Sequence, residues 1–339
     1  MPRPDYPLPQ SVAVHRIHFP PHYVLRWPAL LEVALVLRRV RPDVIHAHYV
    51  GTFGIIAGLY CKLTGFRPLV VSAWGSHGLT HARGVRRRLS KLAFDMAERV
   101  HIDGENMLEV LDAYGVAREK VALVHYGTDV VVFSPAASDE RVRSRCVSDG
   151  GSIVISVRTL DPLYDIATLV RAAARVVREV PATRFIVAGD GSQKQELEKL
   201  ASELGLEGAM RFVGRLTQAE LLAYLASSDI YVSTSLADAG IAASTAEAMA
   251  CGLPAVVTDF GDNRSWVKDG ETGYLFPCGD SDSLAERLIQ LLGDAGMRKR
   301  LGANGRREIV QRNSYRGEMR KMESIYAELI ERCGRSESR

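Results

Sequence analysis

The feature that most constrains the fold is an alternation of short apolar segments with amphipathic ones along nearly the whole chain. The runs 153–157 (IVISV) and 254–258 (PAVVT) are typical of buried strands, while 166–179 has apolar residues at helical spacing. Two strands joined by a helix usually pair in parallel, because the helix returns the chain to the edge of the sheet where the first strand began. The sequence therefore predicts an α/β protein with parallel sheets covered by helices.

The same pattern predicts the other elements and the domain organisation. A length of 339 residues favours two domains, and the polar, irregular stretch 135–151 interrupts the alternation. We expect an N-terminal domain over 1–135, a linker over 136–151, a C-terminal domain over 152–313, and a closing helix and tail over 314–339. Further strands are expected at 12–19, 43–47, 68–73, 99–103, 121–125, 184–188, 210–213, 230–234 and 274–276, and further helices at 28–39, 51–63, 86–97, 107–114, 192–204, 218–226, 244–251, 283–292 and 315–331.

Composition excludes several classes of protein. Hydrophobic residues make up 47% of the chain, which argues against disorder, and the net charge of +3 is too small to indicate a nucleic-acid-binding protein. The five cysteines lack metal-ligand or redox spacing, and no apolar run of about 18 residues predicts a membrane span. The first ten residues also lack the apolar core of a signal peptide, so we expect a cytoplasmic protein with reduced thiols.

A cluster of basic residues lies in the N-terminal half. Five cations occur before the next acidic residue, which is Asp95. They are Arg83, Arg86, Arg87, Arg88 and Lys91. One interpretation is a solvated helix face. The other is a peripheral contact with anionic lipid headgroups, where each cation adds about 1 kcal/mol to binding.

The segment 233–258 (STSLADAGIAASTAEAMACGLPAVVT) predicts a ligand site. A strand ends near Ser235, a loop of small residues follows, and a helix opens near Ser244. Open parallel sheets bind ligands at the carboxyl ends of their strands, and a helix N-terminus attracts phosphate. Glu247 points to the same crevice, although its spacing from Ser244 also fits a capping box, which is a purely structural explanation.

This segment resembles the signature of the family 4 retaining glycosyltransferases, whose fold is called GT-B. The helix and strand at 247–258 (EAMACGLPAVVT) carry most of the resemblance. Further matches are PDVIHAH (42–48), WGS (74–76), GTDVVVFSP (127–135), FIVAGDG (185–191), RFVG (211–214), SSDIYVSTS (227–235) and DGETGYLF (269–276). The resemblance implies two doubly wound, Rossmann-like domains with a cleft between them.

The resemblance also implies roles for individual residues. Glu247 would bind the ribose of the nucleotide, Ser244 and Thr245 would face its diphosphate, and Arg158 would grip that diphosphate. His48 would lie near the reacting sugar, although hydrogen bonding to backbone is the simpler explanation for His46 and His48. The implied catalytic residues are His48, Arg158 and Asp238, the remaining donor-site residues are Gly189, Val213, Gly214, Gly240, Ser244, Thr245 and Glu247, and the acceptor-side residues are Gly75, Ser76 and His77.

Three positions depart from the family pattern. Tyr164 stands where relatives usually have a lysine, six residues after Arg158, so one phosphate cation is missing unless a residue such as Lys194 replaces it. Asp238 precedes Glu247 by nine positions instead of eight, with Ala239 at the usual place of the carboxylate. His77 follows WGS where relatives often have an aspartate.

The beginning of the chain also differs. Relatives open with a strand, a glycine-rich loop, a helix and a second strand, whereas the first expected strand here, 12–19, corresponds to their third. We therefore expect the N-terminal domain to be incomplete by about one βαβ unit, with strand edges left unpaired.

Together these patterns predict a retaining hexosyltransferase that moves a sugar from a nucleoside diphosphate sugar to an acceptor hydroxyl. We expect no metal or other cofactor, because an arginine and a helix N-terminus can balance the leaving-group charge. By analogy with the family, the acceptor is a cell-surface glycan or glycolipid at the cytosolic membrane face. The alternatives are a sugar-nucleotide epimerase on the same fold, and a non-catalytic fragment that binds nucleotide sugars.

Overall fold

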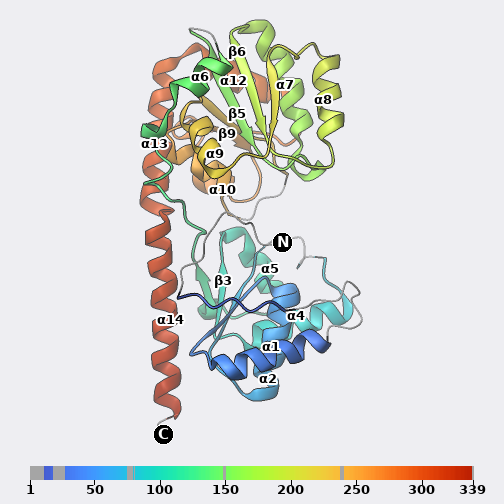
Figure 1. Ribbon diagram of the computed structural model, residues 1–339, viewed down its shortest axis with the longest axis vertical. Coiled ribbons are helices and arrows are strands. Elements are labelled where there is room, and N and C mark those ends of the chain that lie inside the picture. The colour runs from blue at the N-terminus through green and yellow to red at the C-terminus, as the bar shows by residue number, and fades with distance from the viewer. Residues whose placement is uncertain are drawn as a thin grey trace. The chain divides into compact units, whose positions relative to one another are not determined.

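The computed structural model describes residues 11–17, 27–74, 79, 81–147, 150–236 and 240–337. Two compact units form from these residues. The first comprises the described residues of Met1–Ser72, Ala82–Val100 and Tyr326–Arg339, and the second comprises those of Ala73–His81 and His101–Ile325. Strands and helices alternate through both, so the predicted α/β class is confirmed (Figure 1).

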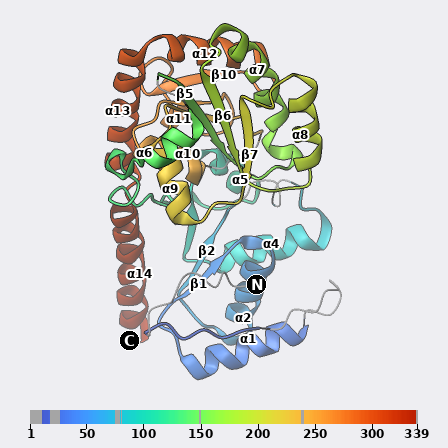
Figure 2. The same ribbon diagram turned by 45° about the horizontal axis from the view of Figure 1, so that its top comes forward.

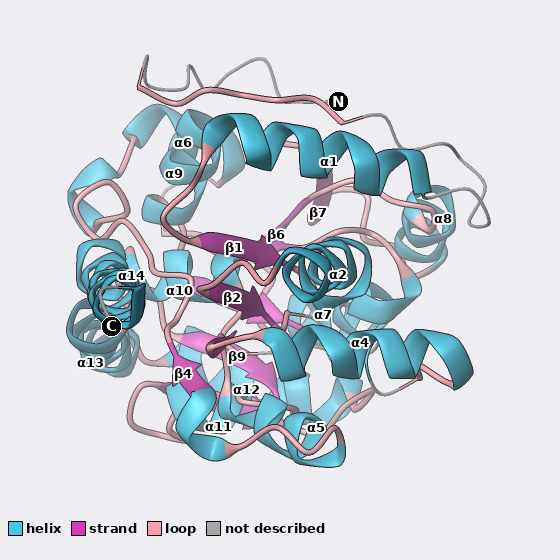
Figure 3. Ribbon diagram, turned by 90° about the horizontal axis from the view of Figure 1, so that it is seen from below, coloured by secondary structure: helices cyan, strands magenta, loops and turns pink. Residues whose placement is uncertain are grey.

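A four-stranded sheet forms from the N-terminal strands, in the order β1-β2-β3-β4. Strands β1 and β2 pair in parallel from Ile45 opposite Leu69 to His48 opposite Ser72. Figure 3 shows α2 and α4 together beside these two strands, with α1 next to β1. The elements are α1 (Trp27–Val40), β1 (Ile45–His48), α2 (Ile55–Thr64), β2 (Leu69–Ser72), α4 (Gly84–Met96), β3 (Arg99–Ile102), α5 (Leu108–Ala113) and β4 (Val121–Leu123).

Close helix packing explains one glycine of the first unit. A Cβ atom on Gly58 of α2 would lie 2.8 Å from the Cα atom of Ala93 in α4. Only a glycine lets the two helix backbones approach this closely, so this pair fixes how α2 packs on α4.

The strand expected at 12–19 is not a strand in the described residues. Residues 11–17 form no regular structure, and Val12 and Val14 are 49% and 61% exposed. Alternating apolar residues stabilise a strand only when a neighbouring strand and a packed face are present, and here neither buries these side chains. Residues 18 and 19 of the expected strand lie outside the described residues.

A six-stranded parallel sheet forms the centre of the second unit, in the order β10-β9-β8-β5-β6-β7. Along the chain, β5, β6 and β7 extend the sheet in one direction, while β8, β9 and β10 extend it in the other. The order therefore reverses between β5 and β8, which is where doubly wound sheets bind ligands. The strands are β5 (Ser152–Val157), β6 (Thr183–Ala188), β7 (Met210–Gly214), β8 (Ile230–Ser233), β9 (Ala255–Thr258) and β10 (Gly273–Phe276).

Helices cover both faces of this sheet, as Figure 2 shows. One face packs on α7 (Ile166–Glu179), α8 (Lys194–Glu203) and α12 (Ser281–Gly293), and its core includes Leu169, Leu197 and Leu288. The other face packs on α6, α9, α10, α11 and α13, and its core includes Leu225, Met249 and Ile309. The bounds on this side are α6 (Glu140–Cys146), α9 (Gln218–Ala226), α10 (Ala243–Ala250), α11 (Asn263–Trp266) and α13 (Ala295–Arg312), and α13 is followed by α14 (Tyr315–Glu337).

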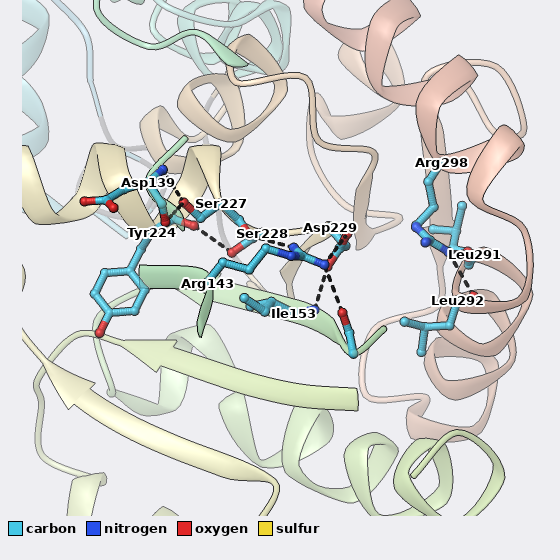
Figure 4. A network of polar contacts seen from close by, with 11 residues as sticks. Asp139, Arg143, Ile153, Tyr224, Ser227, Ser228, Asp229, Leu291, Leu292 and Arg298 are labelled. Carbon is cyan, nitrogen blue, oxygen red and sulfur yellow. Dashed lines mark hydrogen bonds and ion pairs between the residues drawn. The ribbon is translucent and has the colours of Figure 1, made fainter. Parts of the chain in front are cut away.

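Helix α6 lies in the stretch that the sequence analysis describes as irregular. The Arg143 guanidinium holds it in place, because it donates to the Asp229 carboxylate at 3.0 Å, to Ser227 O at 3.0 Å and to Gly151 O at 2.9 Å (Figure 4). Asp229 also accepts from the N–H of Ile153 at 2.8 Å. One arginine thus joins α6 to the chain entering β5 and β8, a set of long-range contacts that residue spacing does not reveal.

Candidate functional site

The backbone at the carboxyl ends of β5, β6 and β7 brings three predicted donor-site residues together. The N–H of Arg158 donates to Ala188 O at 3.1 Å, and the N–H of Gly189 donates to Gly214 O at 2.8 Å. Gly189 has a φ of 143°, and a Cβ atom there would lie 1.9 Å from the carbonyl oxygen of Arg158. Residue 189 must therefore be glycine for these loops to approach. Val213 lies half-buried in β7.

The Arg158 side chain reaches across the point where the strand order reverses. Its Nη2 atom donates to the hydroxyl of Ser235, just after β8, at 2.9 Å. Its Cζ atom lies 4.6 Å from the centre of the Tyr164 ring. The residue that replaces the expected lysine therefore stacks on the arginine that the sequence analysis assigns to the diphosphate.

Helix α10 starts near the same edge of the sheet, and its first turn contradicts the capping-box explanation. The N-cap is Ala242, and no side chain caps the helix. Ser244 lies inside the helix, where its hydroxyl contacts Tyr231 Oη at 2.8 Å, and Thr245 donates to the same oxygen at 3.4 Å. The N–H groups of the first turn have no intrahelical acceptor, so they are available to an anion.

Glu247 is the unusual group of this helix. No hydrogen-bond partner within the described residues satisfies its carboxylate, and desolvation raises its pKa to about 7. A largely buried carboxyl without a partner costs stability in the empty protein. Such groups are concentrated at functional sites, so a ligand that donates to Glu247 is the expected compensation.

An arginine from α13 fixes the opposite end of α10. The Arg306 guanidinium donates to Ala250 O, the last carbonyl of the helix. It also donates to Phe133 O at 3.1 Å and to Val130 O at 3.3 Å. The C-terminal end of α10 and the segment 130–133 therefore share one cation.

Several predicted residues lie outside the described residues. These are Gly75, Ser76, His77 and Asp238, together with Ala239. Gly240 is described, with a φ of 71°, and a Cβ atom there would lie 2.7 Å from the carbonyl oxygen of Asp103. A Cβ atom on Gly104 would lie 2.4 Å from the N atom of Gly240, so the two glycines form a close backbone contact.

The residues that surround this glycine contact were not predicted from the sequence. Asp103 accepts from the N–H of Tyr126 at 2.7 Å, but burial and the nearby Glu318 and Asp262 carboxylates raise its pKa to about 6. Asp262 accepts from the N–H of Asn106 at 3.2 Å. The only local signal was a strand followed by Asp-Gly, which is also common in ordinary turns.

The histidine pair of the first unit forms a side-chain network. The rings of His46 and His48 stack with centroids 4.2 Å apart. His46 shares hydrogen bonds with Tyr326 Oη at 2.5 Å and with Ser72 Oγ at 2.7 Å, and Ser72 Oγ lies 3.4 Å from His48 Nδ1. Desolvation lowers the pKa of His48. These hydrogen bonds join side chains of β1, β2 and α14.

The described residues show neither a metal-binding cluster nor a membrane-spanning helix. In the parts of the chain that the structure describes, no group of three or more His, Cys, Asp and Glu side chains could hold a metal ion. No helix in those parts is both long and apolar enough to cross a bilayer. The five cysteines, all of them within the described residues, form no disulfide.

Comparison with protein families gives two matches that together span most of the chain. The family described as "Glycosyl transferases group 1" matches residues 139–308. The family described as "Glycosyl transferase 4-like" matches residues 1–103. The first match covers half of the chain and contains Arg158, Gly189, Ser244 and Glu247.

Individual proteins are similar over most of their length. The chain is 24% identical over 315 residues to N-acetyl-alpha-D-glucosaminyl L-malate synthase of Bacillus anthracis, covering 92% of this chain and 81% of that protein. It is 28% identical to the MMP alpha-(1->4)-mannosyltransferase of Mycolicibacterium hassiacum, covering 89% and 75%. The crystal structure of Anabaena HepE in complex with UDP superposes with a TM-score of 0.79 at 22% identity, covering 89% and 82%. The last comparison shows the shared fold.

Proposed function

Because the chain belongs to the glycosyl transferases group 1 family and has its GT-B fold, it is a glycosyltransferase, and we propose that its donor is a nucleoside diphosphate sugar whose glycosyl unit is transferred with retention of configuration. The observation that carries the proposal is the contact of Arg158, which follows β5, with Ser235, which follows β8, across the reversal in strand order. Helix α10, which carries Glu247, is the next helix along the chain after β8. UDP bound to Anabaena HepE supports a nucleotide donor.

Each group of the site has a role in this proposal. The diphosphate lies against the N–H groups of Ser244 and Thr245 and against the Arg158 guanidinium, while the loop glycines Gly189, Gly214 and Gly240 allow close approach. As the glycosidic bond breaks, negative charge grows on the diphosphate, and preorganised donors stabilise that charge. A metal ion is not needed for this balance, so we propose metal-independent transfer.

Glu247 binds the sugar of the nucleotide. Ribose carries vicinal hydroxyl groups, and a carboxylate can accept a hydrogen bond from each of them. These two donors satisfy the carboxyl that lacks a partner in the described residues. The ribose therefore selects the ionised form of Glu247.

The acceptor side belongs to the N-terminal region. We assign His48 and Asp238 to the surroundings of the reacting sugar, and Gly75, Ser76 and His77 to the acceptor wall, on the family resemblance. Desolvation of His48 favours a neutral ring, which suits contact with an uncharged sugar.

The acceptor is a growing cell-surface glycan or glycolipid at the cytosolic face of the membrane. Helix α4 and the residue before it expose Arg83, Arg86, Arg87, Arg88 and Lys91, and Val85 among them is 69% exposed. Cations mixed with an apolar side chain fit an anionic lipid surface. Binding to vesicles that contain phosphatidylglycerol, lost on replacing the three arginines 86–88 with glutamine, tests this part separately.

The donor assignment is tested by calorimetry with UDP, GDP and ADP in the presence of EDTA. We expect one of the three to bind, and Arg158→Ala to weaken that binding. Failure of all three to bind the wild type would overturn the donor site. Incubating the matching nucleotide sugar without an acceptor then separates transfer from epimerisation, because only an epimerase converts it to a new nucleotide sugar.

A further inference from the structure

Tyr164 is the residue that the proposed function leaves unexplained. It ends a short 3-10 turn, Pro162–Tyr164, that follows β5 and precedes α7. Its ring packs partly against the core between the sheet and α7. The Arg158 guanidinium lies over this ring. Its Cζ atom is 4.6 Å from the ring centre, which is within the range of a cation–π contact.

The turn that carries Tyr164 is tied to the end of β8. The buried hydroxyl of Thr234 donates to Tyr164 O at 2.7 Å, and the N–H of Leu236 donates to Leu163 O at 2.9 Å. Ser235 lies between these two anchors, and its hydroxyl accepts from Arg158 Nη2. The ring and the hydroxyl that contact the guanidinium therefore belong to two segments fixed to each other.

The backbone of Arg158 is fixed as well. Its N–H donates to Ala188 O, and Gly189 packs against its carbonyl oxygen. Arginine loses considerable rotamer freedom when its head group is immobilised. A guanidinium already held by a ring face and a hydroxyl has lost part of that freedom before a ligand arrives, which favours binding.

We propose that Tyr164 is a positioning residue whose ring holds the Arg158 guanidinium in the orientation required by the diphosphate of the donor. The inference rests on the proposed function, because it assigns the diphosphate to Arg158. The aromatic ring thus takes the place of a second cation by preorganising the first one.

A double-mutant cycle read by calorimetry tests this. The ligand is the diphosphate among UDP, GDP and ADP that the wild type binds most tightly, with the corresponding nucleoside as the phosphate-free probe. Tyr164→Phe keeps the ring face, so its affinity should stay within about twofold of wild type. Tyr164→Leu keeps the bulk without the ring face, so diphosphate binding should weaken about 3- to 10-fold, while nucleoside binding does not change.

The same Tyr164→Leu change in an Arg158→Gln background should alter diphosphate affinity less than twofold, because no cation remains to be oriented. An equal loss in both backgrounds would show that Tyr164 acts only through the fold, and wild-type affinity in Tyr164→Leu would also overturn the inference. Both outcomes leave the donor site intact. A wild type that binds none of the three diphosphates would instead overturn the proposed function, and the inference with it.

A second ring–arginine pair supplies the control. Arg287 Cζ lies 4.7 Å from the centre of the Tyr274 ring elsewhere in the second unit. Tyr274→Leu should lower the melting temperature without changing diphosphate affinity, which separates lost stability from lost orientation. If Tyr164→Leu does not fold, Tyr164→Met serves as the variant without a ring.

Discussion

The carboxyl edges of the two sheets present their functional groups in different ways. After β5, β6 and β7, the backbone itself forms the site, through Gly189, Gly214 and the peptide groups around Arg158. At the carboxyl ends of β1 and β2, stacked histidine rings of β1 are held by the hydroxyls of Ser72 and Tyr326. Backbone groups suit a ligand portion of fixed chemistry such as a diphosphate, whereas side chains can change with the acceptor. Under the proposed function, donor recognition would rest mainly on the backbone of the fold, and acceptor recognition on side chains that can be replaced.

The largest expected effect is that of Arg158→Ala on turnover. Removing a charge-assisted donor from a developing negative charge typically costs about 2.7–4 kcal/mol, or roughly 10²–10³ in rate. Arg171→Ala, an exposed arginine on α7, is the matched control and should leave the rate unchanged. Steady-state kinetics with an identified acceptor gives both values, and a loss below threefold for Arg158→Ala would remove it from the phosphate site.

Gly189→Ala tests whether backbone geometry carries the donor site. The new Cβ atom would overlap the carbonyl oxygen of Arg158 in a backbone conformation that alanine rarely adopts, so we expect a loss of about 2–3 kcal/mol in stability together with weaker diphosphate binding. Gly208→Ala is the control, because a Cβ atom there meets nothing within 4 Å. Denaturant unfolding measures the stability of both variants, and calorimetry measures their diphosphate affinity. Equal stabilities of Gly189→Ala and Gly208→Ala would contradict the close approach of residue 189 to Arg158.

Glu247→Gln should separate stability from binding. Loss of hydrogen bonds to a charged group should weaken nucleotide binding by about 1.5–3 kcal/mol. The pKa of about 7 lies above the usual 4.5, so the folded protein holds this proton more tightly than the unfolded chain. The resulting stability is fully present below pH 4.5 and is lost as the pH rises through about 7.

The glutamine variant should therefore melt at a higher temperature than wild type at pH 8, and this advantage should shrink at pH 5. Melting curves at both values provide the measurement. A difference that stays the same at the two pH values would show that the ionisation of Glu247 has no part in stability.

The smallest expected effect on nucleotide binding is that of His48→Ala. The histidine pair belongs to the first sheet, so diphosphate affinity should stay within about twofold of wild type while transfer to the acceptor falls. His15→Ala, an exposed histidine that the proposal gives no role, serves as the control. A strong loss of diphosphate affinity in His48→Ala would break the proposed division between the two edges.

The sequence predicted most of the elements because their local patterns agree with their tertiary surroundings. The bounds of α7 and α9 match the expectation, and the segments β5 and β6 differ from it by one residue at the start. Helix α6 was missed because it is polar and is held by Arg143 through groups distant in sequence. Helix α13 was also missed, since Gly302 and Gly305 weaken its helical pattern although both lie against neighbouring segments.

Candidate residues for the site could be named from the sequence, but the contacts between them could not be predicted. The pattern around Glu247 predicted a helix there, and its spacing fitted both a cap and a ligand group. The structure excludes the cap, because Ser244 lies inside α10 and contacts Tyr231. The stacking of Tyr164 on Arg158 depends on the fold of two loops, so the sequence showed only that a lysine was absent. Asp103 was missed because its raised pKa comes first from burial in the folded protein and then from the Glu318 and Asp262 carboxylates, which are distant along the chain.

The shared contacts of Arg306 give α10 a mechanical role. Eight residues make a rod about 12 Å long, with first-turn N–H groups that have no intrahelical acceptor at one end and a carbonyl fixed to Arg306 at the other. The segment 130–133, between β4 and β5 along the chain, is held by the same guanidinium. Because a short helix is stiff, we expect a shift of that segment to move the start of α10 as well, which is the end that we propose for the diphosphate. Under the proposed function, donor binding and the position of segment 130–133 should then depend on each other.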